Sequence, residues 1–303
     1  MIDMLTLRTD LKINEAFVAE QLSSNPRFTY QKYVRNFEKL YYLKFSKDIP
    51  SPFKWFTGKS RHAVDRLIHT VEINPNHFRS VFNLHRLLEQ FFIGFSPERF
   101  RVSRLDFAVD VEIPFETVLQ QVYRKKIQQH LAFVSKGGAI SGVVLGKRPV
   151  EAKVYNKTLE QAGKKRRKDV SEAPITRFEV KLLRRSNNKF PIETLSELDQ
   201  LLDYDPFQLY RFKKVKVRDI EPITIESLRS AFIVHTAKDQ AFGGMHQALR
   251  ASRRHFDLLN QRQVLRYFED IEPPELYPVY RRHLERFLSL SSYEEHDIGG
   301  ILV

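Results

Sequence analysis

The chain has 303 residues, enough for one large domain or two of ordinary size, and its 42% hydrophobic and 29% charged residues exclude a disordered protein. It contains no cysteine, which excludes disulfides, thiolate metal sites and cysteine nucleophiles. The 50 Lys and Arg against 37 Asp and Glu give a net charge of +13, which favours a polyanionic partner such as nucleic acid.

An anionic membrane surface is the main alternative partner for so basic a chain. The longest apolar runs fall far short of the ~20 residues that a spanning helix needs, and residues 1–5 (MIDML) show no basic segment followed by an apolar one. We therefore expect no membrane association and no secretory signal, and the absence of cysteine is compatible with a location in the cytoplasm.

The first 92 residues alternate between one helix, a block of strands and a second helix. Apolar residues at helical spacing predict a helix over 11–24. Pro75 is expected to end the last strand of the block, and Asn76 to cap a helix that runs to about Phe92. Aromatic and β-branched residues predict the strands themselves, at 28–34, 40–45, 53–57 and 66–73.

The middle of the chain predicts a long alternating strand over 100–113, broken by Pro114, and a helix over 115–129. Glycines at 137, 138 and 146 mark turns between short strands, which we expect at 131–135, 141–145, 152–156 and 175–183. From about residue 190 the pattern is helical, with an extended segment at 207–217 and helices at 192–202, 224–235, 240–258, 261–271 and 274–290.

Strands in one block followed by helices in another are typical of an α+β fold. We therefore expect an antiparallel-sheet domain over 1–190 and a mostly helical region over 191–303.

Two carboxylates alternate with apolar residues in the segment RLDFAVD at 104–110. Side chains in a strand alternate between faces, so Asp106, Ala108 and Asp110 share one face, and the small Ala108 leaves room for a ligand. Oxygen ligands of this kind suit Mg²⁺ or Mn²⁺. The simpler alternative is a half-buried strand with a solvated acidic face.

Tyr155 lies between two lysines in the segment KVYNK at 153–157. If this segment is extended, Lys153, Tyr155 and Lys157 point the same way, and the positive charges stabilise the phenolate and hold a phosphate. A tyrosine nucleophile needs both conditions. The alternative is a surface tyrosine between two solvated lysines.

A third segment, RFEVK at 177–181, alternates charged and apolar residues. Glu179 can complete a carboxylate metal site with Asp106 or Asp110, and a cross-strand ion pair is the alternative. A basic run precedes this segment, and we expect it to form a loop that contacts the DNA backbone, unless it is only a solvated loop. The residues predicted to contact DNA are Lys164, Lys165, Arg166, Arg167, Lys168, Arg177 and Lys181.

The order of these segments resembles the Rep_trans family of plasmid rolling-circle replication initiators. The family carries an Arg-Leu-Asp-hydrophobic-Ala-x-Asp strand, then an Ile/Val-Tyr-Asn/Asp-Lys segment with the nucleophile, then an Arg-x-Glu-hydrophobic strand. The matching residues here are 104–110, 154–157 with Glu160, and 177–180, together with VEINPN at 71–76 and Gly146. The resemblance covers roughly residues 65–185.

The resemblance implies a divergent histidine-hydrophobic-histidine endonuclease fold in which Tyr155 attacks single-stranded origin DNA and stays linked to the 5′-phosphate. The positive charges of Lys153 and Lys157 are expected to assist catalysis, and the modular organisation of the family implies that residues 191–303 recognise DNA or play an accessory role. The resemblance also implies that Mg²⁺ or Mn²⁺ is bound by Asp106, Asp110 and Glu179, with Glu72 a weaker candidate. Members of the family commonly act as dimers, and strand unwinding needs a helicase partner.

Two other functions fit the same residues. One is a relaxase of a mobile element, which uses the same chemistry in conjugation. The other is a DNA-binding regulator that has the fold without the activity, for which replacing Tyr155 changes nothing.

Overall fold

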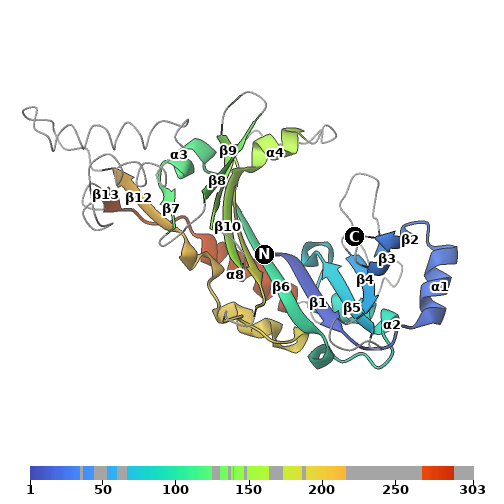
Figure 1. Ribbon diagram of the computed structural model, residues 1–303. Coiled ribbons are helices and arrows are strands. Elements are labelled where there is room, and N and C mark those ends of the chain that lie inside the picture. Colours follow the sequence, from blue (N-terminus) through green and yellow to red (C-terminus); the bar gives the residue numbers. More distant parts are fainter. Residues whose placement is uncertain are drawn as a thin grey trace, which may run out of the picture. The chain divides into compact units, whose positions relative to one another are not determined.

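The computed structural model describes residues 1–34, 37–43, 53–59, 67–124, 130–135, 138, 140–146, 149–163, 173–185, 189–215 and 268–289. This part of the chain is α+β, with antiparallel strands and several helices, in agreement with the predicted class (Figure 1). The chain forms two compact units: unit 1 comprises residues 1–108, 181–205 and 277–303, and unit 2 comprises residues 109–180 and 206–276. The expected functional division at residue 190 stays a prediction.

Unit 1 is built on antiparallel strands in the order β2 (Phe28–Val34), β3 (Phe37–Leu43), β4 (Phe53–Lys59), β5 (Leu67–Ile73), β1 (Ile2–Thr9) and β6 (Arg101–Val111). β1 was not among the strands predicted from the sequence, although it pairs with β5 on one side and with β6 on the other. Leu5 lies opposite Ile73 of β5 and Leu105 of β6, and all three side chains are buried.

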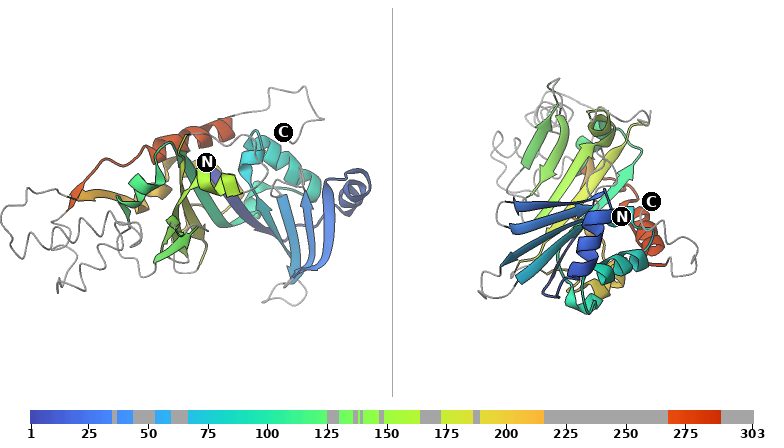
Figure 2. Two further views of the ribbon diagram at one scale, coloured as in Figure 1. Left: turned by 90° about the horizontal axis from the view of Figure 1, so that it is seen from above. Right: turned by 90° about the vertical axis from the view of Figure 1, so that its right-hand side faces the viewer.

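The N-terminal part of unit 1 contains the helices α1 (Glu15–Ser24) and α2 (Val81–Phe91) (Figure 2). Phe91 of α2 packs on β4, with ring centroids 5.0 Å from Phe53 and 6.0 Å from Trp55. The predicted cap at Asn76 is wrong: Ser80 caps α2 by accepting a hydrogen bond from the backbone of Asn83. The residues before it, Pro75–His77, form a separate 3₁₀ turn.

A buried histidine should make unit 1 sensitive to acid. Trp55 Nε1 donates a hydrogen bond to Nδ1 of His69 at 3.2 Å, and burial lowers the pKa of His69 to about 4. Because the unfolded chain takes up the proton near pH 6.5 and the folded one only near 4, the free energy of unfolding should decrease as pH falls through this window.

We expect His69→Asn, which keeps an acceptor for Trp55, to have a flatter stability profile than the parent between pH 6.5 and about 4. Urea unfolding of both proteins at half-unit pH steps measures this difference. Parallel profiles would show that His69 does not carry the linkage.

Unit 2 contains the last residues of β6, followed in order by β11 (Thr176–Leu183), β10 (Val150–Asn156), β9 (Ile140–Leu145) and β8 (His130–Val134). A short helix, α4 (Lys157–Gly163), follows β10 directly. The long strand and the short strands predicted from the sequence are thus confirmed, with small differences at their ends.

A second, three-stranded sheet in unit 2 joins β7 (Val122–Tyr123), β12 (Arg211–Val215) and β13 (Phe268–Asp270). The helix predicted over 115–129 ends early, as α3 (Phe115–Leu119), because the chain then pairs with β12. The helix predicted over 261–271 is wrong at its end, since residues 268–270 pair with β12. The helices predicted over 224–235 and 240–258 lie outside the described residues.

The remaining elements are the 3₁₀ segments η3 (Leu195–Asp203) and η4 (Pro206–Leu209) and the helix α8 (Leu276–Ser289). In unit 1, α8 is fixed by two tyrosines: Tyr277 donates to Leu202 O and Tyr280 to Leu201 O. No helix in the described ranges is long and apolar enough to cross a membrane.

Candidate tyrosine site in unit 2

The two residues at the centre of the site come from neighbouring strands, β10 and β11. Tyr155 Oη donates a hydrogen bond to Glu179 Oε1 at 2.6 Å. Val154 and Phe178, which directly precede them, are buried, so strand alternation places Tyr155 and Glu179 on the opposite face of the sheet. The predicted alternation thus brings the phenol and the carboxylate into contact.

The two lysines flank this pair in different ways. Lys153 lies on the same face of β10, with Nζ 4.0 Å from Glu179 Oε2 and 3.4 Å from Glu151 Oε1. The sequence predicted that Lys157 lies in an extended segment, but in the structure it is the first residue of α4. Its Nζ nevertheless lies 5.8 Å from the centroid of the Tyr155 ring, and it donates to Glu160 at 2.5 Å.

The pKa of Tyr155 is raised, chiefly by burial and then by the charge of Glu179 and the hydrogen bond to it, while Arg177 opposes the shift. The expectation that positive charge would stabilise the phenolate is therefore wrong for this arrangement, because the nearest charged group is a carboxylate. The phenol stays protonated at neutral pH, and the carboxylate lies where it can accept the proton.

The carboxylates expected to bind metal already have other partners. Asp110 accepts two hydrogen bonds from Arg177, at 2.5 and 2.7 Å, and Asp106 accepts from Nε of Arg104 at 2.8 Å. Glu179 accepts from Tyr155.

Glu72, the fourth candidate, and Asp106 belong to unit 1, whereas Asp110 and Glu179 belong to unit 2. Ala108, between the two carboxylates of β6, is 1% exposed. Among the residues that the structure describes, no three His, Asp or Glu side chains gather as a metal site. The metal site stays a prediction, and the chemistry below uses the chain's own groups.

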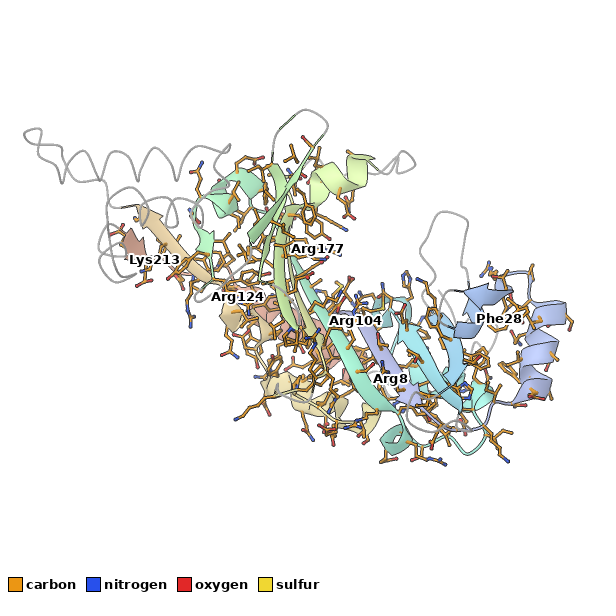
Figure 3. The ribbon with its side chains drawn as sticks, in the orientation of Figure 1. Arg8, Phe28, Arg104, Arg124, Arg177 and Lys213 are labelled. Atoms are coloured by element: carbon orange, nitrogen blue, oxygen red, sulfur yellow. The ribbon has the colours of Figure 1, made fainter. Side chains whose placement is uncertain are left out.

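The residues predicted to contact DNA fall into three sets. Residues 164–168 lie outside the described residues. Arg177 of β11 (Figure 3) is engaged by Asp110, and Lys181 is half-buried in unit 1. Lys213 of β12 is 7% exposed and pairs with Asp270 at 2.6 Å.

Tyr210 is a positioning residue that the sequence analysis missed. Its hydroxyl lies 2.7 Å from the carbonyl oxygen of Lys153 and 2.6 Å from that of Glu179, and its ring packs edge-on against Phe178 at 5.2 Å. Tyr210 therefore joins β10 and β11, the two strands that carry Tyr155 and Glu179. Nothing local in the sequence indicates this, since Tyr210 is 31 residues away from Glu179.

Arg124 holds the turn that precedes Tyr155. Its Nη1 donates to Leu145 O at 2.9 Å and Val150 O at 3.1 Å, which bridges β9 and β10. Gly146, in this turn, has a φ of +105°, and a Cβ there would lie 2.6 Å from Arg124 Nη1. Gly146 therefore allows both the turn and the close approach of the Arg124 guanidinium.

A second glycine makes room for the tyrosine itself. Gly142 of β9 pairs with Tyr155 on one side and with Phe133 of β8 on the other. A Cβ at Gly142 would lie 2.7 Å from Tyr155 Cβ and 3.0 Å from Phe133 Cδ2. Phe133 is 47% exposed, so an accessible aromatic ring lies beside the site.

Tyr210→Phe should weaken unit 2. The change removes the hydroxyl that the two carbonyl oxygens share, and we expect the free energy of unfolding to fall by ~1–3 kcal/mol. Urea unfolding measures the loss. Tyr123→Phe is the matched control, because Tyr123 is also buried but its hydroxyl makes no hydrogen bond to a described residue. An equal loss in both variants would contradict the bridging role.

Comparisons with known proteins add no family: no protein-family model matches this chain, and no curated protein is significantly similar to it.

Proposed function

We propose that this chain is a tyrosine-dependent DNA strand transferase, which nicks and rejoins single-stranded origin DNA as a rolling-circle replication initiator. The observation that carries the proposal is the 2.6 Å hydrogen bond from Tyr155 Oη to Glu179 Oε1 on a half-buried sheet face. A hydroxyl nucleophile beside a base is the arrangement that covalent catalysis requires.

In the proposed reaction, Glu179 accepts the phenolic proton while Tyr155 Oη attacks the phosphorus of a phosphodiester. The bond from phosphorus to the 3′-oxygen breaks, and this oxygen leaves with the electron pair and takes a proton from water. The products are a 5′-phosphotyrosine and a free 3′-hydroxyl, and the reverse reaction rejoins the strand. Lys153 and Lys157 lie close enough to offset the charge of the phosphate oxygens.

The net charge of +13 and the exposed ring of Phe133 support a nucleic-acid substrate. Aromatic side chains stack on unpaired bases regardless of sequence, so Phe133 is suited to hold a base next to the reacting phosphate. A double-stranded substrate offers no such free base face, which favours a single strand.

The test is covalent capture on a denaturing gel. The protein is mixed with single-stranded oligonucleotides from its own replicon, labelled at either the 5′ or the 3′ end, with and without Mg²⁺ or Mn²⁺. We expect an SDS-stable band with the 3′ label only, because the tyrosine keeps the 3′-side fragment. DNA binding without an adduct under any condition would favour the non-catalytic regulator.

A further inference from the structure

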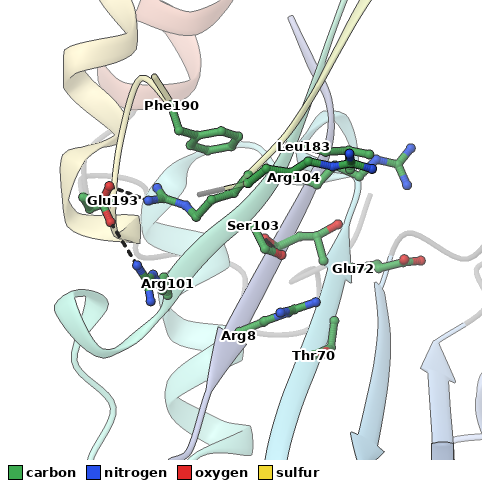
Figure 4. A pocket seen from close by; sticks show the side chains of 12 residues that line it. Arg8, Thr70, Glu72, Arg101, Ser103, Arg104, Leu183, Phe190 and Glu193 are labelled. Carbon is green, nitrogen blue, oxygen red and sulfur yellow. Dashed lines mark hydrogen bonds and ion pairs between the residues drawn. The ribbon is translucent and has the colours of Figure 1, made fainter. Parts of the chain in front are cut away.

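Unit 1 contains a second basic site, separate from the residues of the tyrosine site. An open hollow of about 780 Å³ lies over β5, β1 and β6 and the segment that follows β11 (Figure 4). All of its lining residues belong to unit 1. They are Thr6, Arg8, Thr70, Glu72, Arg101, Ser103, Arg104, Leu183, Arg184, Arg185, Phe190 and Glu193.

One wall of the hollow is held rigidly by Arg184. Its guanidinium donates to the carbonyl oxygens of Val102 and Ile192, pairs with Glu193 and lies 4.5 Å from the centroid of the Phe190 ring. Arg101 also approaches Glu193, at 3.7 Å (Figure 4). These contacts build the wall, so the binding capacity must come from other side chains.

The side chains available to bind a ligand lie on the floor and rim of the hollow. The hollow is lined by five arginines and two glutamates, so its lining has an excess of three positive charges. Arg8 projects from β1 beside Thr70 and is exposed (Figure 4), and its guanidinium makes no hydrogen bond or ion pair with a described residue. An exposed guanidinium in a concave basic site suits a phosphate group, which it can bind with two hydrogen bonds.

Thr6 supplies an independent observation. Its side chain is 7% exposed, and its Oγ1 has no hydrogen-bond partner among the residues that the structure describes. A buried hydroxyl without a partner costs ~1–3 kcal/mol, a cost that a ligand oxygen in the hollow would offset once the Thr6 side chain rotated toward it. Ser103, next to it, uses its hydroxyl to donate to Thr6 O.

We propose that this hollow binds a backbone phosphate of single-stranded DNA, with Arg8 and Thr6 as the principal contacts. The volume of about 780 Å³ suits a nucleotide-sized group rather than a lone phosphate ion. The inference rests on the proposed function for the identity of the strand. It adds a second anchoring point, on residues that take no part in the chemistry at Tyr155.

The test measures the affinity of the full chain for a fluorescent oligothymidylate by anisotropy at several salt concentrations. We expect Arg8→Gln to weaken binding about tenfold, and to reduce the slope of log K against log salt by ~0.7 for the one lost phosphate contact. The matched control is Arg282→Gln, which removes an exposed arginine of α8 outside the hollow. Equal effects of the two changes would overturn the proposal.

Thr6→Val separates binding from folding. Because it removes a hydroxyl without a partner, we expect unchanged or higher stability in urea together with weaker binding of the oligonucleotide. Unchanged affinity would overturn the role of Thr6. Displacement of the oligonucleotide by inorganic phosphate beyond that by chloride of equal ionic strength would assign the hollow to the free ion instead.

The two proposals fail in different ways. If Arg8→Gln binds like the parent while covalent capture persists, only the hollow is wrong. If no adduct forms but Arg8→Gln weakens binding selectively, the hollow stands as a DNA site and the nicking function is wrong.

Discussion

The Tyr155→Phe variant is expected to form no SDS-stable adduct with single-stranded DNA under conditions in which the parent chain is captured. The change removes the only atom of the side chain that can bond to phosphorus. Covalent capture should therefore fall below detection. The affinity for DNA should change by less than about threefold, because the substitution removes at most one hydrogen bond to the DNA. The gel measures the first quantity and anisotropy the second.

The fold should survive this substitution. Phenylalanine keeps the ring between Gly142 and Lys157, and Glu179 keeps Lys153 as a partner at 4.0 Å. Tyr123→Phe, in the same unit, controls for the general effect of removing a phenol and should be captured like the parent. An adduct that persisted in Tyr155→Phe would keep the enzyme class but move the nucleophile to another tyrosine.

The strands that carry the site were predictable because local pattern and tertiary context agree. In β6, β10 and β11, apolar residues such as Val154, Phe178 and Val180 alternate with polar ones, and the apolar set is buried. β1 shows the same alternation, with Leu5 and Leu7 buried, but it was overlooked in a short segment.

Errors occurred where pairing with a distant segment decides the structure. Residues 122–123 and 268–270 have patterns that are compatible with helices, yet both pair with β12. The contacts of Tyr210 with the two site strands are of the same kind, because Lys153 is 57 positions away from it in the sequence and Glu179 is 31 positions away. Neither periodicity nor a capping signal reports such pairs.

The carboxylates illustrate a different limit. The residue pattern correctly predicted that Asp110 and Glu179 lie on strands, but spacing cannot indicate which partner each one takes. Asp110 is matched by the guanidinium of Arg177, and Glu179 by the phenol. The role of Glu179 therefore changes from expected metal ligand to proposed base, and this change can be tested.

Glu179→Gln should slow covalent capture by ~10²–10⁴-fold at pH 7, the range that a positioned general base contributes. Glutamine keeps the size of the side chain but cannot accept the phenolic proton. The matched control is Glu151→Gln, because Glu151 also contacts Lys153, at 3.4 Å, but does not contact the phenol. The control should react at nearly the parent rate in single-turnover assays.

The pH dependence then separates a base from a metal ligand. Burial raises the pKa of Tyr155 most, and Glu179 adds to this by its charge and its hydrogen bond, so removing Glu179 should lower that pKa while leaving it above its ordinary value. The residual rate of Glu179→Gln should consequently rise with pH across the alkaline range, as more phenolate forms without a base. In the parent, the raised pKa of Tyr155 has an effect on stability instead. The stabilisation that comes from the protonated phenol is fully present below about pH 10, and it decreases as the pH rises above that value. If excess Mg²⁺ or Mn²⁺ instead restored the variant at neutral pH, without a change in the pH profile, Glu179 would be a metal ligand and the base would lie elsewhere.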